Sequence, residues 1–279
     1  MKPRLSKTAV LAAALLALNL WLVRGLLKYE YLVQMGSIAG SFIGIARWIR
    51  QYWPDLEWFP LWYGGIPFIH TYPPLLHQLV ALVSAIFRAS PAHAYHATVA
   101  ITYSLGPVTL FLLARRLGAS PGCAFASGLF YSLFSPSVLF LAAVRHSAGG
   151  VWVARRLQAL VEYGEGPHVT ALTLLPLALW LLATAFEKRK PLWWFLAALG
   201  LASVSLTNWL GAVALALAAA AWLAAANAGW RRWLEAAGLA ALAYGIACRW
   251  LPPSYIRTIA ENEKYLSGPL SPWPGRMVI

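Results

Sequence analysis

Side chains able to carry out acid–base chemistry are few in this sequence, and most of them lie in two segments between apolar stretches. The chain of 279 residues has only 9 acidic side chains. Glu30 and Asp55 lie in the first segment, whereas Glu165 and His168 lie close together in the second. A carboxylate or an imidazole can act as a general base. We therefore take Glu30, Asp55, Glu165 and His168 as candidate catalytic residues.

Two interpretations of Glu165 and His168 stay open at this stage. A carboxylate and an imidazole would suit a divalent metal ion as well as a general base. A helix-ending turn with solvated charges explains the same residues almost as well, and the chain has no zinc-type spacing such as HExxH. No cofactor is therefore assigned, and a divalent metal ion stays as an alternative.

Basic, aromatic and polar side chains in the same two segments could bind a substrate. An arginine such as Arg47 could meet a phosphate or could lie at a surface with its charged end in water. The rings of 53–75, a segment rich in Pro, Gly and aromatic residues, could form an interfacial belt or a platform for an apolar ligand face. The candidate binding residues are Arg47, Glu57, Trp62, Tyr63, His70, Tyr72, Arg145, His146, Arg155, Arg156 and Asn208.

The composition places these residues in a membrane protein. Hydrophobic residues make up 60% of the chain and charged residues 11%, whereas soluble domains are roughly 45–50% apolar and about 25% charged. Intrinsic disorder and a disulfide scaffold are excluded too, because the chain is too apolar and has only 2 cysteines. The net charge of +13 does not indicate nucleic-acid binding in a chain so deeply embedded.

Seven apolar stretches are long enough to predict an all-α, polytopic bundle that forms a single membrane domain over 1–279. Lys2, Arg4 and Lys7 precede the first stretch and predict a cytoplasmic N-terminus in the cell (inner) membrane, with an uncleaved anchor. The later basic clusters should also be cytoplasmic, so an even number of spans should separate one cluster from the next. The predicted spans are 8–27, 94–114, 121–142, 169–186, 191–207, 210–228 and 234–250.

Two outer loops, 28–93 and 143–168, would then hold most of the candidate residues. Segment 73–88 is short for a span and opens with two prolines, so we expect an interfacial helix. If it crossed instead, Arg115 and Arg116 would lie outside. We also expect helices over 35–52 and 151–163, the second with its arginines on the polar side. The span interiors hold no ionisable group, which argues against an ion-coupled transporter.

Five sequence motifs resemble the amino-terminal module of GT-C-type integral membrane glycosyltransferases. The nearest resemblance is to prokaryotic membrane proteins labelled pyruvoyl-tetrahydropterin synthase-related, and it covers most of the chain. The motifs are residues 60–67 (PLWYGGIP), 72–75 (YPPL), 114–118 (ARRLG), 163–168 (YGEGPH) and 206–209 (LTNW). Longer relatives have further spans and a soluble domain, so this chain is expected to be truncated at its C-terminus or a partial copy.

The resemblance implies transfer of a sugar from a polyprenyl-phosphate donor on the non-cytoplasmic face of the bilayer. Glu30 occupies the place where such enzymes usually have an aspartate, Asp55 is its competitor, and Glu165 with His168 would come from the second loop. A carboxylate would take the acceptor proton while arginines hold the donor phosphate. The alternatives are a non-catalytic subunit that binds or assembles lipid-linked glycans and, less favoured, a transporter. The sequence does not determine the sugar, the acceptor or the oligomeric state.

Overall fold

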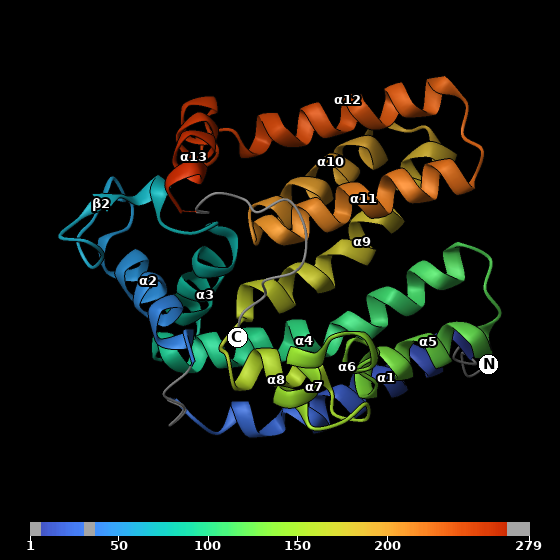
Figure 1. Ribbon diagram of the computed structural model, residues 1–279, viewed down its shortest axis with the longest axis horizontal. Coiled ribbons are helices and arrows are strands. Elements are labelled where there is room, and N and C mark those ends of the chain that lie inside the picture. Colours follow the sequence, from blue (N-terminus) through green and yellow to red (C-terminus); the bar gives the residue numbers. More distant parts are fainter. Residues whose placement is uncertain (1–6, 31–36, 267–279) are drawn as a thin grey trace.

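The computed structural model describes residues 7–30 and 37–266, and within them the prediction of an all-α chain is confirmed (Figure 1). The short elements are two 3-10 turns, η1 (Arg24–Leu27) and η2 (Phe68–His70), and one antiparallel pair, β1 (Trp58–Phe59) with β2 (Ile66–Pro67). The α-helices are α1 (Lys7–Val23), α2 (Ala39–Tyr52), α3 (Leu75–Ile86), α4 (Pro91–Arg116), α5 (Pro121–Leu133), α6 (Ser137–Phe140), α7 (Ala142–Ala148), α8 (Arg155–Val161), α9 (Gly166–Lys188), α10 (Pro191–Ser205), α11 (Trp209–Ala225), α12 (Trp230–Ala247) and α13 (Pro253–Leu266).

Three of these helical segments are long and apolar enough to cross a membrane. They are Lys7–Leu27, Pro91–Arg116 and Gly166–Lys188. Helices α3, α10 and α11 are apolar but shorter. The three long segments indicate a membrane protein, whereas the total of seven spans stays a prediction.

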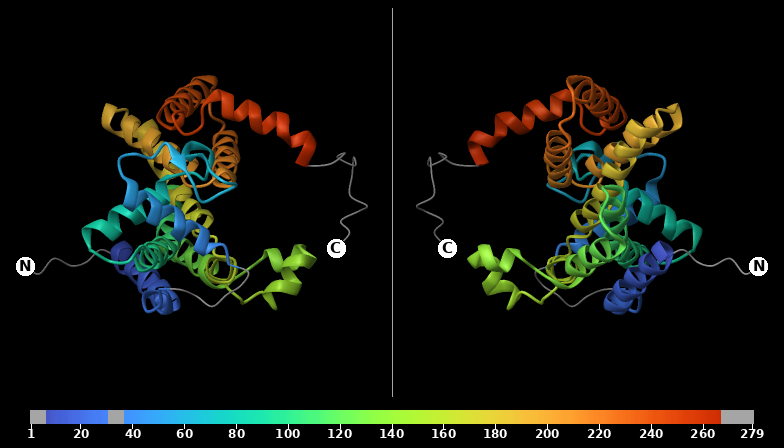
Figure 2. Two further views of the ribbon diagram at one scale, coloured as in Figure 1. Left: turned by 90° about the vertical axis from the view of Figure 1, so that its left-hand side faces the viewer. Right: turned by 90° about the vertical axis from the view of Figure 1, so that its right-hand side faces the viewer.

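The expectation of one continuous helix over 121–142 is wrong. Helix α5 ends at Leu133, and Phe134 has extended backbone angles of φ −120° and ψ 137°. Pro136 lacks a backbone N–H and disfavours the helical conformation for the residue before it. The Ser135 N–H instead donates to Val151 O over 2.7 Å. Helices α6 and α7 then form an arm that projects away from the long helices (Figure 2).

The basic clusters meet at one end of the bundle, the right-hand end in Figure 1. Arg116 at the end of α4 forms an ion pair with Glu187 of α9. Arg189 follows α9 and contacts Glu235 of α12 over 3.2 Å. Arg232 of α12 donates to the carbonyl of Phe186 over 2.9 Å. The helices therefore run in the directions that the even-number rule requires of these clusters, although the side of the membrane stays a prediction.

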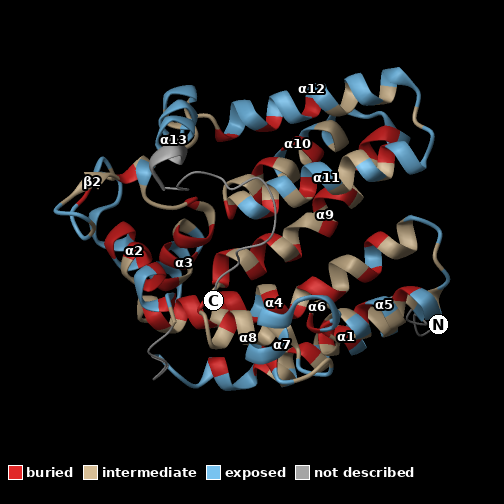
Figure 3. Cartoon of the chain, viewed as in Figure 1, coloured by how far each residue is buried: buried red, intermediate tan, exposed pale blue. Residues whose placement is uncertain are grey.

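Helices α4 and α9 form the centre of the fold, joined by polar side chains. Thr173 Oγ1 of α9 donates to Thr102 O of α4 over 2.8 Å, and Thr109 Oγ1 of α4 donates to Thr173 O over 2.9 Å. Such hydrogen bonds hold apolar helices together in the absence of a hydrophobic driving force between them. Helices α2 and α3 cover one end of α4, and buried residues concentrate there, whereas α12 is largely exposed (Figure 3).

Candidate functional site

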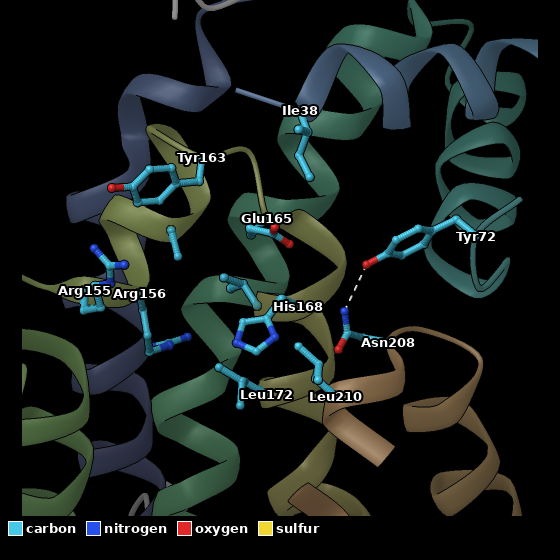
Figure 4. A pocket seen from close by; sticks show the side chains of 12 residues that line it. Ile38, Tyr72, Arg155, Arg156, Tyr163, Glu165, His168, Leu172, Asn208 and Leu210 are labelled. Atoms are coloured by element: carbon cyan, nitrogen blue, oxygen red, sulfur yellow. Dashed lines mark hydrogen bonds between the residues drawn. The ribbon is translucent and has the colours of Figure 1, made fainter. Parts of the chain in front are cut away.

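A cavity of about 640 Å³ lies at the end of the bundle opposite the basic clusters. It brings together six of the fifteen predicted site residues from separate segments. Figure 4 shows the arginines of α8 on one side, Tyr72 and Asn208 on the other, and Glu165 with His168 between them. The six residues are Tyr72, Arg155, Arg156, Glu165, His168 and Asn208.

Arg156 is the most unusual member of this site, because it is a buried charge with no acidic partner among residues 7–30 and 37–266. Its side chain comes from α8 but lies between the rings of Tyr103 and Tyr131, with the guanidinium carbon 4.3 Å and 4.1 Å from the ring centroids. Nη2 donates to Tyr103 O over 2.8 Å. In the part of the chain that the structure describes, Nε and Nη1 have no hydrogen-bond partner.

The placement of Arg156 corrects the expectation for segment 151–163. Both arginines were expected on the polar face of an interfacial helix, but Arg156 is only 8% exposed and enters the bundle between α4 and α5. Gly106 of α4 makes the room, because a Cβ at this position would lie 2.4 Å from Arg156 Nη2. Burial of unsatisfied guanidinium donors is costly, so an anion that reaches them would be bound firmly.

Arg155 has its own hydrogen-bond partners on α7 and α8. It donates to Ser147 Oγ over 3.0 Å and to Gln158 Oε1 over 2.5 Å. Gln158 Nε2 in turn donates to Glu162 Oε2 over 2.8 Å. The guanidinium carbon lies 5.2 Å from the ring centroid of Tyr163. Arg155 is therefore held at the cavity by neutral groups. Glu162 is connected to it only through Gln158.

Glu165 and His168 are positioned by the start of α9. Gly164, just before them, has a φ of +75°, a left-handed conformation that favours glycine. A Cβ at Gly164 would also lie 2.4 Å from the backbone nitrogen of Ala39. Glu165 is half-buried at the N-terminus of α9, where the helix dipole favours a negative charge.

Tyr72 and Asn208 form the opposite wall. Asn208 Nδ2 donates to the Tyr72 hydroxyl oxygen over 3.0 Å, and Trp250 Nε1 donates to Tyr72 O over 3.1 Å. Burial raises the pKa of the Tyr72 phenol, the hydrogen bond from Asn208 opposes that rise, and the charge of Glu165 adds to it. The phenol is therefore protonated at neutral pH.

His77 of α3 lies behind this wall and was not predicted as a site residue. Its ring is fully buried, 5.4 Å from the ring centroid of Phe42 and 5.7 Å from that of Tyr72. Within the described residues neither ring nitrogen has a hydrogen-bond partner. Burial lowers the pKa of His77 to about 3, so the ring is neutral at physiological pH.

The other two predicted catalytic carboxylates do not line the cavity. Glu30 accepts a hydrogen bond from Ser90 Oγ, and Ser90 also accepts from the backbone N–H of His93 at the start of α4. This contact gives Glu30 a structural role at the end of the helix. Asp55 is exposed in the segment before β1. The assignment of either residue to catalysis stays a prediction.

Seven predicted binding residues also lie outside the cavity lining. In the first loop, Trp62 packs on Phe59, Tyr63 is 94% exposed, and His70 stacks on Tyr255 with ring centroids 4.9 Å apart. Arg145 donates to Val138 O over 3.1 Å and so holds α6 against α7. The remaining three are exposed: Arg47, Glu57 and His146.

The aromatic partners of Arg156 were missed by sequence reasoning. Tyr103 and Tyr131 lie inside predicted spans, and nothing in their spacing connects them with an arginine of a distant loop. As for a metal, no group of three His, Cys, Asp or Glu side chains in residues 7–30 and 37–266 could hold one.

No family model, curated protein or solved structure matches this chain. The resemblance to GT-C glycosyltransferases therefore stays a prediction that rests on the sequence motifs. The geometry of the cavity supplies a separate argument, because it combines a carboxylate, an imidazole and two arginines. Such a set can accept a proton at one point and hold an anion at another.

Proposed function

We propose that this chain is a membrane glycosyltransferase that uses a sugar linked to a polyprenyl phosphate. The observation that carries the proposal is the cavity in which Glu165 and His168 meet the arginines of α8. A phosphate-linked lipid fits this set, because its phosphate can reach guanidinium donors while its chain stays among apolar helices. Leu172 and Leu210 line the same cavity and supply an apolar side for such a ligand.

The proposed reaction assigns a separate task to each group. Glu165 takes the proton from the acceptor hydroxyl, and the acceptor oxygen forms a bond to the anomeric carbon of the sugar. The bond between that carbon and the phosphate oxygen breaks, and the polyprenyl phosphate leaves with the electron pair. Arg156 and Arg155 stabilise the negative charge of the leaving group. His168 is close enough along α9 to share the proton-transfer role.

The proposal includes the seven-span topology with the cavity on the non-cytoplasmic face. The gathering of three basic clusters at the opposite end supports this orientation, because cytoplasmic loops carry an excess of Lys and Arg. Reporter fusions after residues 90, 117, 150, 189, 208 and 231 should report out, in, out, in, out and in. A cytoplasmic report at residue 90 would overturn the topology.

Release of polyprenyl phosphate from a polyprenyl-phosphoryl hexose by the protein in lipid nanodiscs tests the chemistry. Glu165→Gln should slow release about 10²–10⁴-fold, whereas Glu162→Gln is a matched control because Glu162 belongs to the neighbouring turn but not to the cavity lining. Equal release by both variants would refute the role of Glu165.

A non-catalytic subunit that binds lipid-linked glycans is the second candidate. Arg156 is buried, and its Nε and Nη1 have no hydrogen-bond partner among the described residues, which favours binding of an anion whether or not chemistry follows. Tight binding of the same lipid without any release by the unmodified protein would select this alternative. A transporter would instead require reactive positions midway through several spans in cysteine-accessibility labelling.

A further inference from the structure

The cap of helix α11 fixes the direction of a hydrogen bond at the cavity wall. Asn208 is the N-cap of α11, and its Oδ1 accepts from the backbone N–H of Gly211 over 3.0 Å. An amide has one oxygen and one NH₂ group, so commitment of the oxygen to the cap turns Nδ2 toward Tyr72. The orientation of the amide therefore follows from the helix cap.

This orientation determines what the Tyr72 hydroxyl can do. Its oxygen accepts from Asn208 Nδ2, so its own hydrogen must be donated to another group. No acceptor for that hydrogen lies within hydrogen-bond distance among the described residues. Tyr72 lines the cavity, and its phenol keeps its proton because burial raises its pKa. The hydrogen is thus available to a ligand.

Glu165 supplies the complementary group in the same cavity, since a carboxylate only accepts hydrogen bonds. We propose that Tyr72 and Glu165 form a recognition pair for a hydroxyl group of the ligand. The hydroxyl donates its hydrogen to Glu165 and accepts the hydrogen of Tyr72. An ammonium group has no lone pair for Tyr72, so the pair selects an alcohol, such as a sugar hydroxyl, over an amine.

Asn208 is then a positioning residue, and this inference rests on the proposed function for the choice of ligand. Asn208→Asp keeps an oxygen for the Gly211 N–H, and Asp is as good an N-cap as Asn. Its second oxygen is an acceptor, however, so the Tyr72 hydroxyl would donate to Asp and no longer to the ligand. The Asn208→Asp variant therefore changes ligand recognition while it keeps the cap of α11.

Binding to the full chain in nanodiscs tests the pair with farnesyl-phosphoryl glucose, mannose and galactose as ligands. Farnesyl phosphate, which lacks the sugar hydroxyls, is the matched control ligand. Tyr72→Phe and Asn208→Asp should each weaken binding of the best hexose ligand about tenfold, the effect of roughly one hydrogen bond. Binding of farnesyl phosphate should change less than about twofold by the same argument. Asn208→Asp should add nothing to Tyr72→Phe.

Three results would overturn the pair: unchanged hexose binding by Tyr72→Phe, an equal loss for farnesyl phosphate, or no preference of the unmodified protein for any hexose ligand. If Asn208→Asp weakened hexose binding by its full amount in the Tyr72→Phe background as well, its effect would come from charge repulsion and not from the Tyr72 hydroxyl. Asn208 would then not be a positioning residue for Tyr72. Failure of the proposed function looks different. If the protein released no polyprenyl phosphate but Tyr72→Phe still weakened hexose binding, the proposed transferase activity would be refuted and the recognition pair would be supported.

Discussion

Arginines at the two ends of the bundle have opposite surroundings. At one end Arg116 and Arg189 pair with Glu187 and Glu235, and all four side chains are partly exposed. At the other end Arg156 is buried between two tyrosine rings, with two donors unpaired in the described part of the chain. The first arrangement ties helices together, whereas the second leaves hydrogen-bonding capacity unused.

The arginines at one end of the bundle contribute to stability, whereas the buried arginine at the other end is suited to ligand binding. Exposed ion pairs contribute about 0–1 kcal/mol, so they refine the register of helices at little cost. A buried unpaired guanidinium destabilises the empty protein, because its donors have left water without finding partners. We expect substitutions at the two ends to differ in sign as well as in size.

The largest expected effect is on turnover at the cavity end. Glu165→Gln should lower the rate of polyprenyl phosphate release by about 10²–10⁴-fold, because the variant cannot accept the acceptor proton. Glu187→Gln removes a carboxylate from the other end and should leave that rate unchanged. Comparable losses in both variants would abolish the distinction between the two ends.

Arg156→Met should produce a change of opposite sign in two measurements. Loss of charge-assisted hydrogen bonds worth about 1.5–3 kcal/mol should weaken binding of farnesyl phosphate by roughly 10–100-fold. The thermal midpoint of the empty protein should stay the same or rise, because an apolar side chain of similar length replaces a buried charge. A lower midpoint with unchanged binding would show that Arg156 is structural.

His77 should make the cavity end sensitive to acid. Its pKa is lowered to about 3 in the folded state, so the unfolded state binds more protons between about pH 6.5 and 3. Stability is therefore lost as the pH falls through this window, by up to about 1.4 kcal/mol per pH unit. His77→Phe should remove this part of the pH dependence of the thermal midpoint, whereas His146→Gln, at an exposed site, should not.

The smallest effect is expected at the end with the ion pairs. Glu235→Gln should lower the free energy of unfolding by less than about 1 kcal/mol, because its partners Arg189 and Arg232 remain in contact with water. Binding of farnesyl phosphate should not change. A loss of several kcal/mol would mean that this network is as sensitive as a buried site, which would weaken the contrast.

Much of the helical framework could be predicted from the sequence, because hydrophobicity and charge act locally. The long apolar runs predicted α1, α4 and α9, and the basic clusters predicted that their connections share one end. The break at Pro136 was missed because the apolar composition continues past it to residue 142. Hydropathy measures partition into lipid and does not register a missing backbone donor.

The site could be predicted only in part. The residue types identified Glu165, His168 and the arginines, but not that Glu30 and Asp55 would lie elsewhere. That separation depends on how α2 and α3 pack on α4. The burial of Arg156 depends on a glycine and two tyrosines from other helices, and no local pattern encodes such a contact.

The early end of α5 has a consequence for the surrounding lipid. Its 13 residues span about 20 Å, against about 30 Å of hydrocarbon in a typical bilayer. On the proposed topology, thinning of the bilayer beside α5 is one way to accommodate this mismatch, and it would bring headgroups toward the midplane on the side where Tyr131 meets Arg156. A lipid phosphate in that thinned patch has a shorter distance to travel, so less of its chain leaves hydrocarbon on the way to the cavity. Local membrane thickness is thus a variable that should control access to this protein.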